Sequence, residues 1–280
     1  MGFLRVVEVF PPMFPSSTKT EAIDLRGKMA NLVEEVRSIR RVCDIVLVAN
    51  VKNPAKVKLS TVEAASILQE KVKVPAAPSV VARDENRLQL TSTMLTTMGK
   101  GLAWMLLVWG DDYPPQVGTT NVRDYASLSE VIDEASLLRR RSRSKTKFLA
   151  PVDLRRLSKE SGVELARSRI KAGAEFLLAQ PPTTDSGRTL DEHLSLLDST
   201  GLKGKVLLNV FPFRDSADVR HCEGYFGWKL PKPLHRLAAE GRAALLEEAR
   251  AVQARLRDSG APGVYVSTRG HPDVAKEILG

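Results

Sequence analysis

Cysteine and histidine are scarce in this chain of 280 residues. The two cysteines, Cys43 and Cys222, lie far apart, and the four histidines are scattered. Two cysteines cannot build a disulfide framework or a zinc ribbon, and no histidine pair has the His-Glu-x-x-His spacing of a zinc enzyme. We therefore expect no metal site, and we expect the protein to work in a reducing compartment, the cytoplasm.

Long apolar runs are also missing. The longest, residues 102–109, is too short to span a bilayer. Residues 1–10 have the pattern of a strand and lack the longer apolar core of a signal peptide. The sequence thus predicts no membrane partner and a cytoplasmic location.

Several nucleotide-binding and catalytic motifs are absent. The chain has no P-loop and no Gly-x-Ser-x-Gly element. Its first apolar run leads into Pro11-Pro12, where an open dinucleotide-binding sheet usually has a glycine-rich turn. These absences argue against a P-loop enzyme, a serine hydrolase and a sheet of the dinucleotide-binding type.

Acidic residues are too few to balance the basic ones, and the formal net charge is +9. Much of the local excess lies in residues 139–147. A positive balance favours acidic partners, either polymers or small molecules. A nucleic-acid surface would usually interleave aromatic residues, but this run has only Phe148 beside it. We interpret the run as a solvated helix end and expect no nucleic-acid partner.

Short apolar runs alternate with stretches of helical period along the whole chain. Hydrophobic residues make up 43% of the sequence, which is enough for a large core. Almost continuous apolar runs are typical of parallel strands that are buried on both faces. We predict strands near residues 4–10, 44–50, 76–82, 104–110, 147–153, 176–181, 205–211 and 263–268, and a last helix over 234–258.

This alternation predicts an α/β fold, a single (β/α)8 TIM barrel that occupies residues 1–280 as one domain. An open doubly wound sheet is the alternative. In a barrel, functional residues lie where strands end, at the C-terminal mouth. The residues that we single out at those positions are Glu8, Gly110-Asp111, Asp153, Gln180, Asn209 and Thr268.

Each of these residues has a structural and a functional interpretation. Glu8 lies within an apolar strand, either as one half of a buried ion pair or as a general acid whose pKa is raised by burial. Asp111 either caps a turn or contacts a ligand. The amide of Gln180 either stabilises the loop or binds a ring edge that both donates and accepts hydrogen bonds.

Taken in order, these segments resemble methylenetetrahydrofolate reductase. The similar segments are Val7-Glu8-Val9-Phe10-Pro11-Pro12, Val108-Trp109-Gly110-Asp111 with Pro114-Pro115, Lys171-Ala172-Gly173-Ala174-Glu175-Phe176 with Ala179-Gln180, and Val264-Tyr265-Val266-Ser267-Thr268. The resemblance implies that Glu8 is a general acid, that Asp111 lies beside flavin and pterin, and that Gln180 contacts the folate and nicotinamide rings. It also implies FAD as cofactor and NAD(P)H as reductant.

The chain departs from that family at positions that contact FAD. Ser79 replaces a histidine, Trp109 an arginine, and Ser168 an arginine. By the resemblance, the cofactor-binding residues are Asn50, Ser79, Trp109, Gly110, Asp111, Arg167 and Arg169, and the substrate-binding residues are Gln180, Asn209 and Thr268. We expect FAD to bind weakly, and direct hydride transfer without FAD remains an alternative.

The predicted function is therefore that of a cytoplasmic oxidoreductase that reduces a 5,10-methylene-pterin to the 5-methyl form in one-carbon metabolism. The alternative is a non-redox pterin-binding barrel that partners a methyltransferase. The sequence leaves open whether the substrate is methylene-tetrahydrofolate or a modified pterin, whether NADH or NADPH is used, and whether the chain forms a homo-oligomer.

Overall fold

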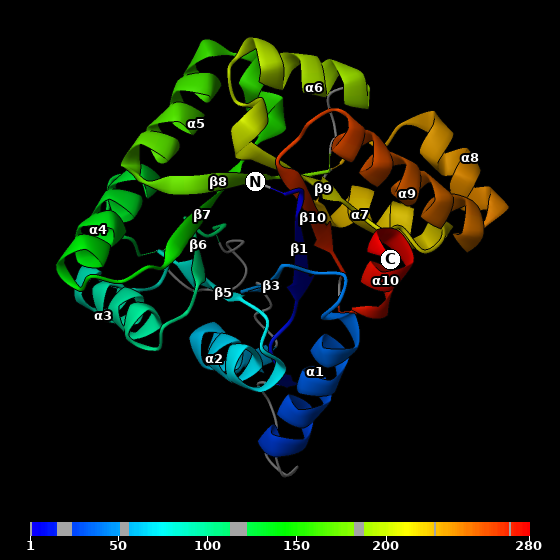
Figure 1. Ribbon diagram of the computed structural model, residues 1–280. Helices are drawn as coiled ribbons and strands as arrows, with labels where there is room; N and C mark the ends of the chain where they lie inside the picture. Colours follow the sequence, from blue (N-terminus) through cyan, green and yellow to red (C-terminus); the bar gives the residue numbers. More distant parts are fainter. Residues whose placement is uncertain are drawn as a thin grey trace.

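Eight parallel strands close into a barrel in the computed structural model, which describes residues 2–15, 24–50, 56–112, 122–181, 188–226, 228–268 and 270–280. Their order around the barrel is β1-β10-β9-β8-β7-β6-β5-β3. The strands are β1 (Leu4–Val9), β3 (Ile45–Val48), β5 (Ala76–Val81), β6 (Trp104–Val108), β7 (Lys147–Val152), β8 (Ala174–Ala179), β9 (Val206–Val210) and β10 (Gly263–Ser267). The predicted (β/α)8 TIM barrel is confirmed (Figure 1).

Helices surround the barrel and connect its strands (Figure 1). They are α1 (Leu25–Ile39), α2 (Thr61–Val72), α3 (Arg87–Gly99), α4 (Leu128–Arg141), α5 (Glu160–Ala172), α6 (Leu190–Ser199), α7 (Ser216–Phe226), α8 (Lys232–Glu240), α9 (Arg242–Asp258) and α10 (Asp273–Leu279), with short 3-10 turns η2 (Leu154–Ser158) and η3 (Lys203–Lys205). A small antiparallel ribbon pairs β2 (Met13–Pro15) with β4 (Lys56–Lys58). Among the described helices, none is long and apolar enough to cross a bilayer.

Several helices begin where their sequences provide a capping oxygen. The side chains of Ser60, Asn86 and Ser127 accept the first free backbone N–H groups of α2, α3 and α4. Thr189 forms a reciprocal capping box with Glu192 at the start of α6. Such local signals set the residue at which each of these helices begins.

The last predicted helix, residues 234–258, is divided in the structure. Gly241 has a φ of +112° and separates α8 from α9. A side chain would strain that conformation, whereas glycine adopts it readily. The hydrophobic period of a helix thus continues in the sequence on both sides of Gly241, although the helix itself is interrupted there.

Alternation along the strands creates two apolar layers. Residues such as Val7, Val46 and Leu208 pack outward against the helices. Val6, Ala77, Phe176 and Leu207 are among those that fill the barrel interior. Because side chains alternate between the two faces, the inner face also receives the polar residues Glu8, Ser79, Gln180, Asn209, Tyr265 and Ser267.

Candidate active site at the barrel mouth

Glu8 is the centre of a hydrogen-bonded group near the C-terminal end of β1. Ser267 Oγ donates a hydrogen bond of 2.6 Å to Glu8 Oε1, and the Tyr265 hydroxyl donates to Glu8 Oε2. Both donors lie on the neighbouring strand β10, where Ser267 is the register partner of Glu8. Since Tyr265 and Ser267 are two residues apart on a strand, their side chains project from the same face.

Burial raises the pKa of the Glu8 carboxyl, and the hydrogen bonds from Ser267 and Tyr265 only partly oppose this. Burial and the adjacent Glu8 also raise the pKa of the Tyr265 phenol well above its usual value, so Tyr265 stays a donor. In the described part of the chain, no cation forms an ion pair with Glu8. The structure thus favours a neutral carboxylic acid over one half of a buried ion pair.

Two buried amide oxygens share the inner face with Glu8. Gln180 Oε1 and Asn209 Oδ1 are buried and accept no hydrogen bond within the described residues. Asn209 is the register partner of Tyr265, while Gln180 directly follows β8. A buried acceptor without a donor is costly in an otherwise well-packed protein. These two oxygens are therefore suited to receive hydrogen bonds from a ligand.

Thr268, predicted to bind substrate, makes a backbone contact. Its hydroxyl donates a hydrogen bond of 2.6 Å to the carbonyl oxygen of Glu8 and is buried. It therefore connects the ends of β1 and β10. The sequence interpretation chose Thr268 and missed Tyr265 and Ser267 as partners of Glu8. The two-residue alternation of β10 was the signal that could have identified them.

Two arginines donate hydrogen bonds to the backbone just after β6. Gly110 has a φ of +83°, and its carbonyl oxygen accepts a hydrogen bond of 2.6 Å from Arg123 Nη2. Arg83 Nη1 donates to the carbonyl oxygen of Asp111. The guanidinium of Arg123 lies 5.1 Å from the centre of the Trp109 ring. The Asp111 side chain itself is exposed, so the structure places this carboxylate on the rim and not beside Glu8.

Lys58 is a basic residue near the mouth that the sequence interpretation missed. It lies on β4, and its Nζ donates to Oδ1 of Asn50, two residues after β3. Burial lowers the pKa of Lys58, the nearby Arg83 lowers it further, and Asp84 acts in the opposite direction. Because Lys58 comes from the segment between β3 and α2, no strand-end pattern pointed to it.

The remaining predicted cofactor contacts are dispersed. Ser79 is buried on the inner face, and its backbone carbonyl accepts a 2.8 Å hydrogen bond from Thr61. Arg167 Nη2 donates to Thr200 O, at the end of α6, at 2.8 Å. Arg169 Nη1 donates to the carbonyl of Pro151 in β7. The two arginines thus bind separate backbone carbonyls and form no shared clamp.

The described residues contain no cluster of three histidine, cysteine, aspartate or glutamate side chains that could hold a metal ion. The carboxylates near the mouth lie apart from one another. Glu8 lies on the inner face, while Asp112 is on the rim and pairs with Arg123 at 2.8 Å. The polar groups described near the mouth are Glu8, its two hydroxyl partners, the two amide oxygens and Lys58.

No protein-family model and no curated protein matches this sequence. Solved structures do match its fold. A 2,3-dimethylmalate lyase of the PEP mutase/isocitrate lyase superfamily is 12% identical, with a TM-score of 0.55 over 98% of this chain and 77% of that one. Oxaloacetate acetylhydrolase in complex with oxalate is 12% identical, with a TM-score of 0.54 over 98% and 78%. A phosphoenolpyruvate phosphomutase from Streptomyces platensis subsp. rosaceus is 13% identical, with a TM-score of 0.52 over 96% and 78%.

These matches correct the functional prediction. The similar structures are a lyase, a hydrolase and a mutase, and they contradict the resemblance to methylenetetrahydrofolate reductase. The expected NAD(P)H-dependent oxidoreductase, its FAD and its pterin substrate are therefore wrong. The motifs that suggested them lie at barrel strand ends, where the fold itself favours polar residues and tight turns. At this level of identity, the matches establish the shared barrel fold.

Proposed function

We propose that the barrel mouth binds a small organic acid and that Glu8 transfers a proton to it in a reaction of the lyase or mutase type. The observation that carries this proposal is the buried carboxyl of Glu8, whose raised pKa favours the neutral acid. A carboxylic acid whose pKa is raised holds its proton to a higher pH than usual, which suits general acid catalysis. Its location at a strand end agrees with where barrel enzymes place catalytic groups.

The neighbouring hydroxyls support the proton transfer. After Glu8 donates its proton, it becomes a carboxylate that accepts the hydrogen bonds of Ser267 and Tyr265. Hydrogen bonds to an ionised acceptor are stronger than those to a neutral one. Glu8 can therefore give its proton to the carbanion that forms when a substrate carbon–carbon bond breaks and the other fragment leaves as a carbonyl compound, or when water takes the phosphoryl group from a carbon–phosphorus bond.

Polar groups around the mouth fit an organic acid. Gln180 Oε1 and Asn209 Oδ1 can accept hydrogen bonds from a hydroxyl or a protonated acid group. Lys58 provides a positive charge for a carboxylate or phosphonate. Its hydrogen bond to Asn50 locates the ammonium group near the strand ends. The names of the similar structures mention dimethylmalate, oxaloacetate, oxalate and phosphoenolpyruvate, all of which are small organic acids.

Residues 1–280 are proposed to form one domain in which both ends of the chain complete the same barrel. The pairing of β1 with β10 supports this, because it closes the barrel with the first and last strands. A reducing compartment such as the cytoplasm is proposed as the location. Its support is that Cys43 and Cys222 are both buried and unpaired.

Binding of oxalate to the purified protein tests the substrate class by calorimetry at neutral pH and about 150 mM salt. We expect Lys58→Met to weaken binding about tenfold, the scale of one charge-assisted hydrogen bond. The matched control is Lys56→Met, which removes an exposed lysine from the same short strand. Absence of binding at millimolar oxalate, or an equal loss in both variants, would contradict the proposed substrate class.

Turnover tests the role of Glu8. The protein is incubated with 2,3-dimethylmalate, oxaloacetate or phosphoenolpyruvate, and products are followed by proton and phosphorus NMR. We expect Glu8→Gln to lower the rate by about two to four orders of magnitude, as for the loss of a general acid. Oxalate binding should change much less than turnover in this variant. Full activity in folded Glu8→Gln protein would refute the assignment.

A further inference from the structure

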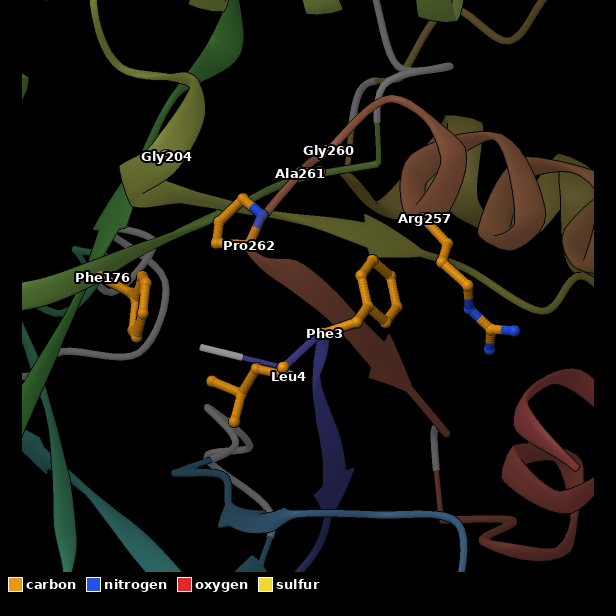
Figure 2. A pocket seen from close by; sticks show the side chains of 9 residues that line it. Phe3, Leu4, Phe176, Gly204, Arg257, Gly260, Ala261 and Pro262 are labelled. Carbon is orange, nitrogen blue, oxygen red and sulfur yellow. The ribbon is translucent and has the colours of Figure 1, made fainter.

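A cavity lies at the end of the barrel opposite Glu8, where strands begin. Its volume is about 410 Å³, and it is bordered by the first residues of β1, by Phe176 of β8 and by the turn before β10. Figure 2 shows Leu4, Phe176 and Pro262 around this space, with Phe3 lying between Leu4 and Arg257. A cavity of this size falls within the range of small-ligand sites.

Aromatic rings and cations gather around this end of the barrel. The rings of Trp104 and Phe176 are stacked with their centres 6.2 Å apart. Lys147 Nζ lies 5.1 Å from the Trp104 ring, and Lys205 Nζ lies 5.9 Å from the Phe176 ring. The Arg257 guanidinium lies 5.6 Å from the ring of Phe3. Three cations therefore sit over aromatic faces at one end of the molecule.

The carboxylate partners of these three cations decide how much of their charge a ligand can meet. Within the described ranges, neither Lys147, Lys205 nor Arg257 forms an ion pair with a carboxylate. Lys205 Nζ has a backbone partner, the carbonyl oxygen of Glu175 at 3.4 Å. The cavity therefore combines an apolar wall with positive charge that an anionic group can offset.

The connection from α4 to β7, which includes Lys147, is also positively charged. Residues 139–147 contain six basic residues and no acidic one. They join the end of α4 to the start of β7, so they lie at the same end of the barrel as the cavity. A cluster of like charges raises the local concentration of anions and favours their encounter. The excess of basic residues thus has a specific location on the fold.

We infer that this cavity binds a small aromatic anion, with its planar ring against Phe176, Leu4 and Pro262 and its acid group toward Arg257. Aryl carboxylates, sulfonates and phosphates share this chemistry. The apolar wall is suited to the planar ring, and the Arg257 guanidinium is suited to the acid group. This site is separate from the barrel mouth and does not depend on the function proposed there.

A fluorescence titration with 8-anilinonaphthalene-1-sulfonate tests the inference, since this probe is an aromatic anion. Arg257→Ala should weaken binding about fivefold to tenfold, whereas Arg26→Ala removes the same charge from the exposed start of α1, at the mouth end of the barrel, and should leave binding unchanged. Naphthalene-1-sulfonate should displace the probe, and sulfate at the same concentration should not.

A second variant separates this cavity from other sites for the probe. Gly204 borders the cavity, and a Cβ added there would meet no atom within 4 Å. Gly204→Leu should therefore fold normally, fill the cavity and weaken probe binding, while Glu8→Gln should leave it unchanged. Equal losses in Arg257→Ala and Arg26→Ala would show general charge attraction and overturn the inference. Unchanged binding in Gly204→Leu would overturn it as well.

Discussion

Replacing Glu8 by glutamine should change how the stability of this protein depends on pH. In the folded state, burial raises the pKa of Glu8 above its ordinary value of 4.5, against the opposing effect of the Ser267 and Tyr265 hydrogen bonds. The folded protein therefore holds this proton more tightly than the unfolded chain does. Glutamine has a similar shape and remains neutral at every pH, so the variant lacks this contribution.

The size and sign of the effect follow from proton linkage. Between pH 4.5 and the folded-state pKa of Glu8, the folded state binds more protons than the unfolded state. The free energy of unfolding of the wild type should therefore fall through this window, by up to about 1.36 kcal/mol for each pH unit. Above the folded-state pKa, the loss is complete and the contribution of Glu8 no longer changes.

Glutamine also rearranges the local hydrogen bonds. Its oxygen can still accept one hydroxyl hydrogen, but its NH2 group meets the other hydroxyl and requires that hydroxyl to act as acceptor. This constant, pH-independent cost is about 0.5–1.5 kcal/mol. The pH dependence of the difference between variant and wild type therefore isolates the titration of Glu8.

Urea unfolding from about pH 5 to about pH 9 measures this difference, and an unchanged denaturant slope confirms that the same transition is compared. The stability of Glu8→Gln relative to wild type should rise with pH and then level off. Glu164→Gln, at an exposed position of α5, is the control for losing a surface carboxylate. A difference that is constant with pH, or that falls as pH rises, would refute the conclusion that the fold favours neutral Glu8.

Three further results are expected. Tyr265→Phe removes one hydrogen bond to Glu8, so it should lower the free energy of unfolding by about 1 kcal/mol. The same loss raises the pKa of Glu8 further, so in the Tyr265→Phe background the stability gain of Glu8→Gln should level off at a higher pH. A plateau that begins at the same pH would contradict this coupling. Gly110→Ala should destabilise the protein by about 2–4 kcal/mol, because φ is +83° and the new Cβ would lie 2.7 Å from a valine methyl of β5. The control is Gly99→Ala, whose Cβ meets nothing within 4 Å. Equal Tm values for the two variants would count against the packing described. Burial raises the pKa of Cys43 to about 12 and that of Cys222 to about 11, so Ellman's reagent should react with neither thiol until urea unfolds the protein; rapid labelling of native protein would show that the thiols are accessible.

The barrel was predictable because its signals are local and repeated. Continuous apolar runs such as those of β3 and β9 indicated strands with two buried faces. A capping serine such as Ser127 is likewise a local feature, since its side chain accepts a backbone N–H group of the helix that follows. The division of the last helix at Gly241 was missed because the amphipathic period continues on both sides of the glycine.

The candidate site was only partly predictable. Glu8, Gln180 and Asn209 could be selected because a polar residue within or just after an apolar strand is unusual. Lys58 could not, since it reaches the mouth from a small ribbon whose pairing is nonlocal. The exposed side chain of Asp111 depends on how Arg83 and Arg123 hold its backbone, and this too requires the folded structure.

The mistaken family assignment has a related cause. The quoted segments, such as Phe10-Pro11-Pro12 and Gly110-Asp111, are short and lie where barrel strands turn into loops. Many unrelated activities share this architecture, so strand-end motifs carry less information about chemistry than about fold. The shared order of such motifs reflected the repeated β/α arrangement.

The pH titration of the Glu8 carboxyl carbon, followed by 13C NMR with and without oxalate, tests the central claim most directly. Protein labelled at glutamate carboxyl carbons provides the signal, and its loss in Glu8→Gln assigns it. The account predicts titration above the ordinary value of 4.5 and a further upward shift when oxalate binds, because a nearby negative charge favours the neutral acid. A Glu8 carboxyl that titrates at its ordinary value and does not respond to oxalate would contradict both the buried neutral acid and the organic-acid site.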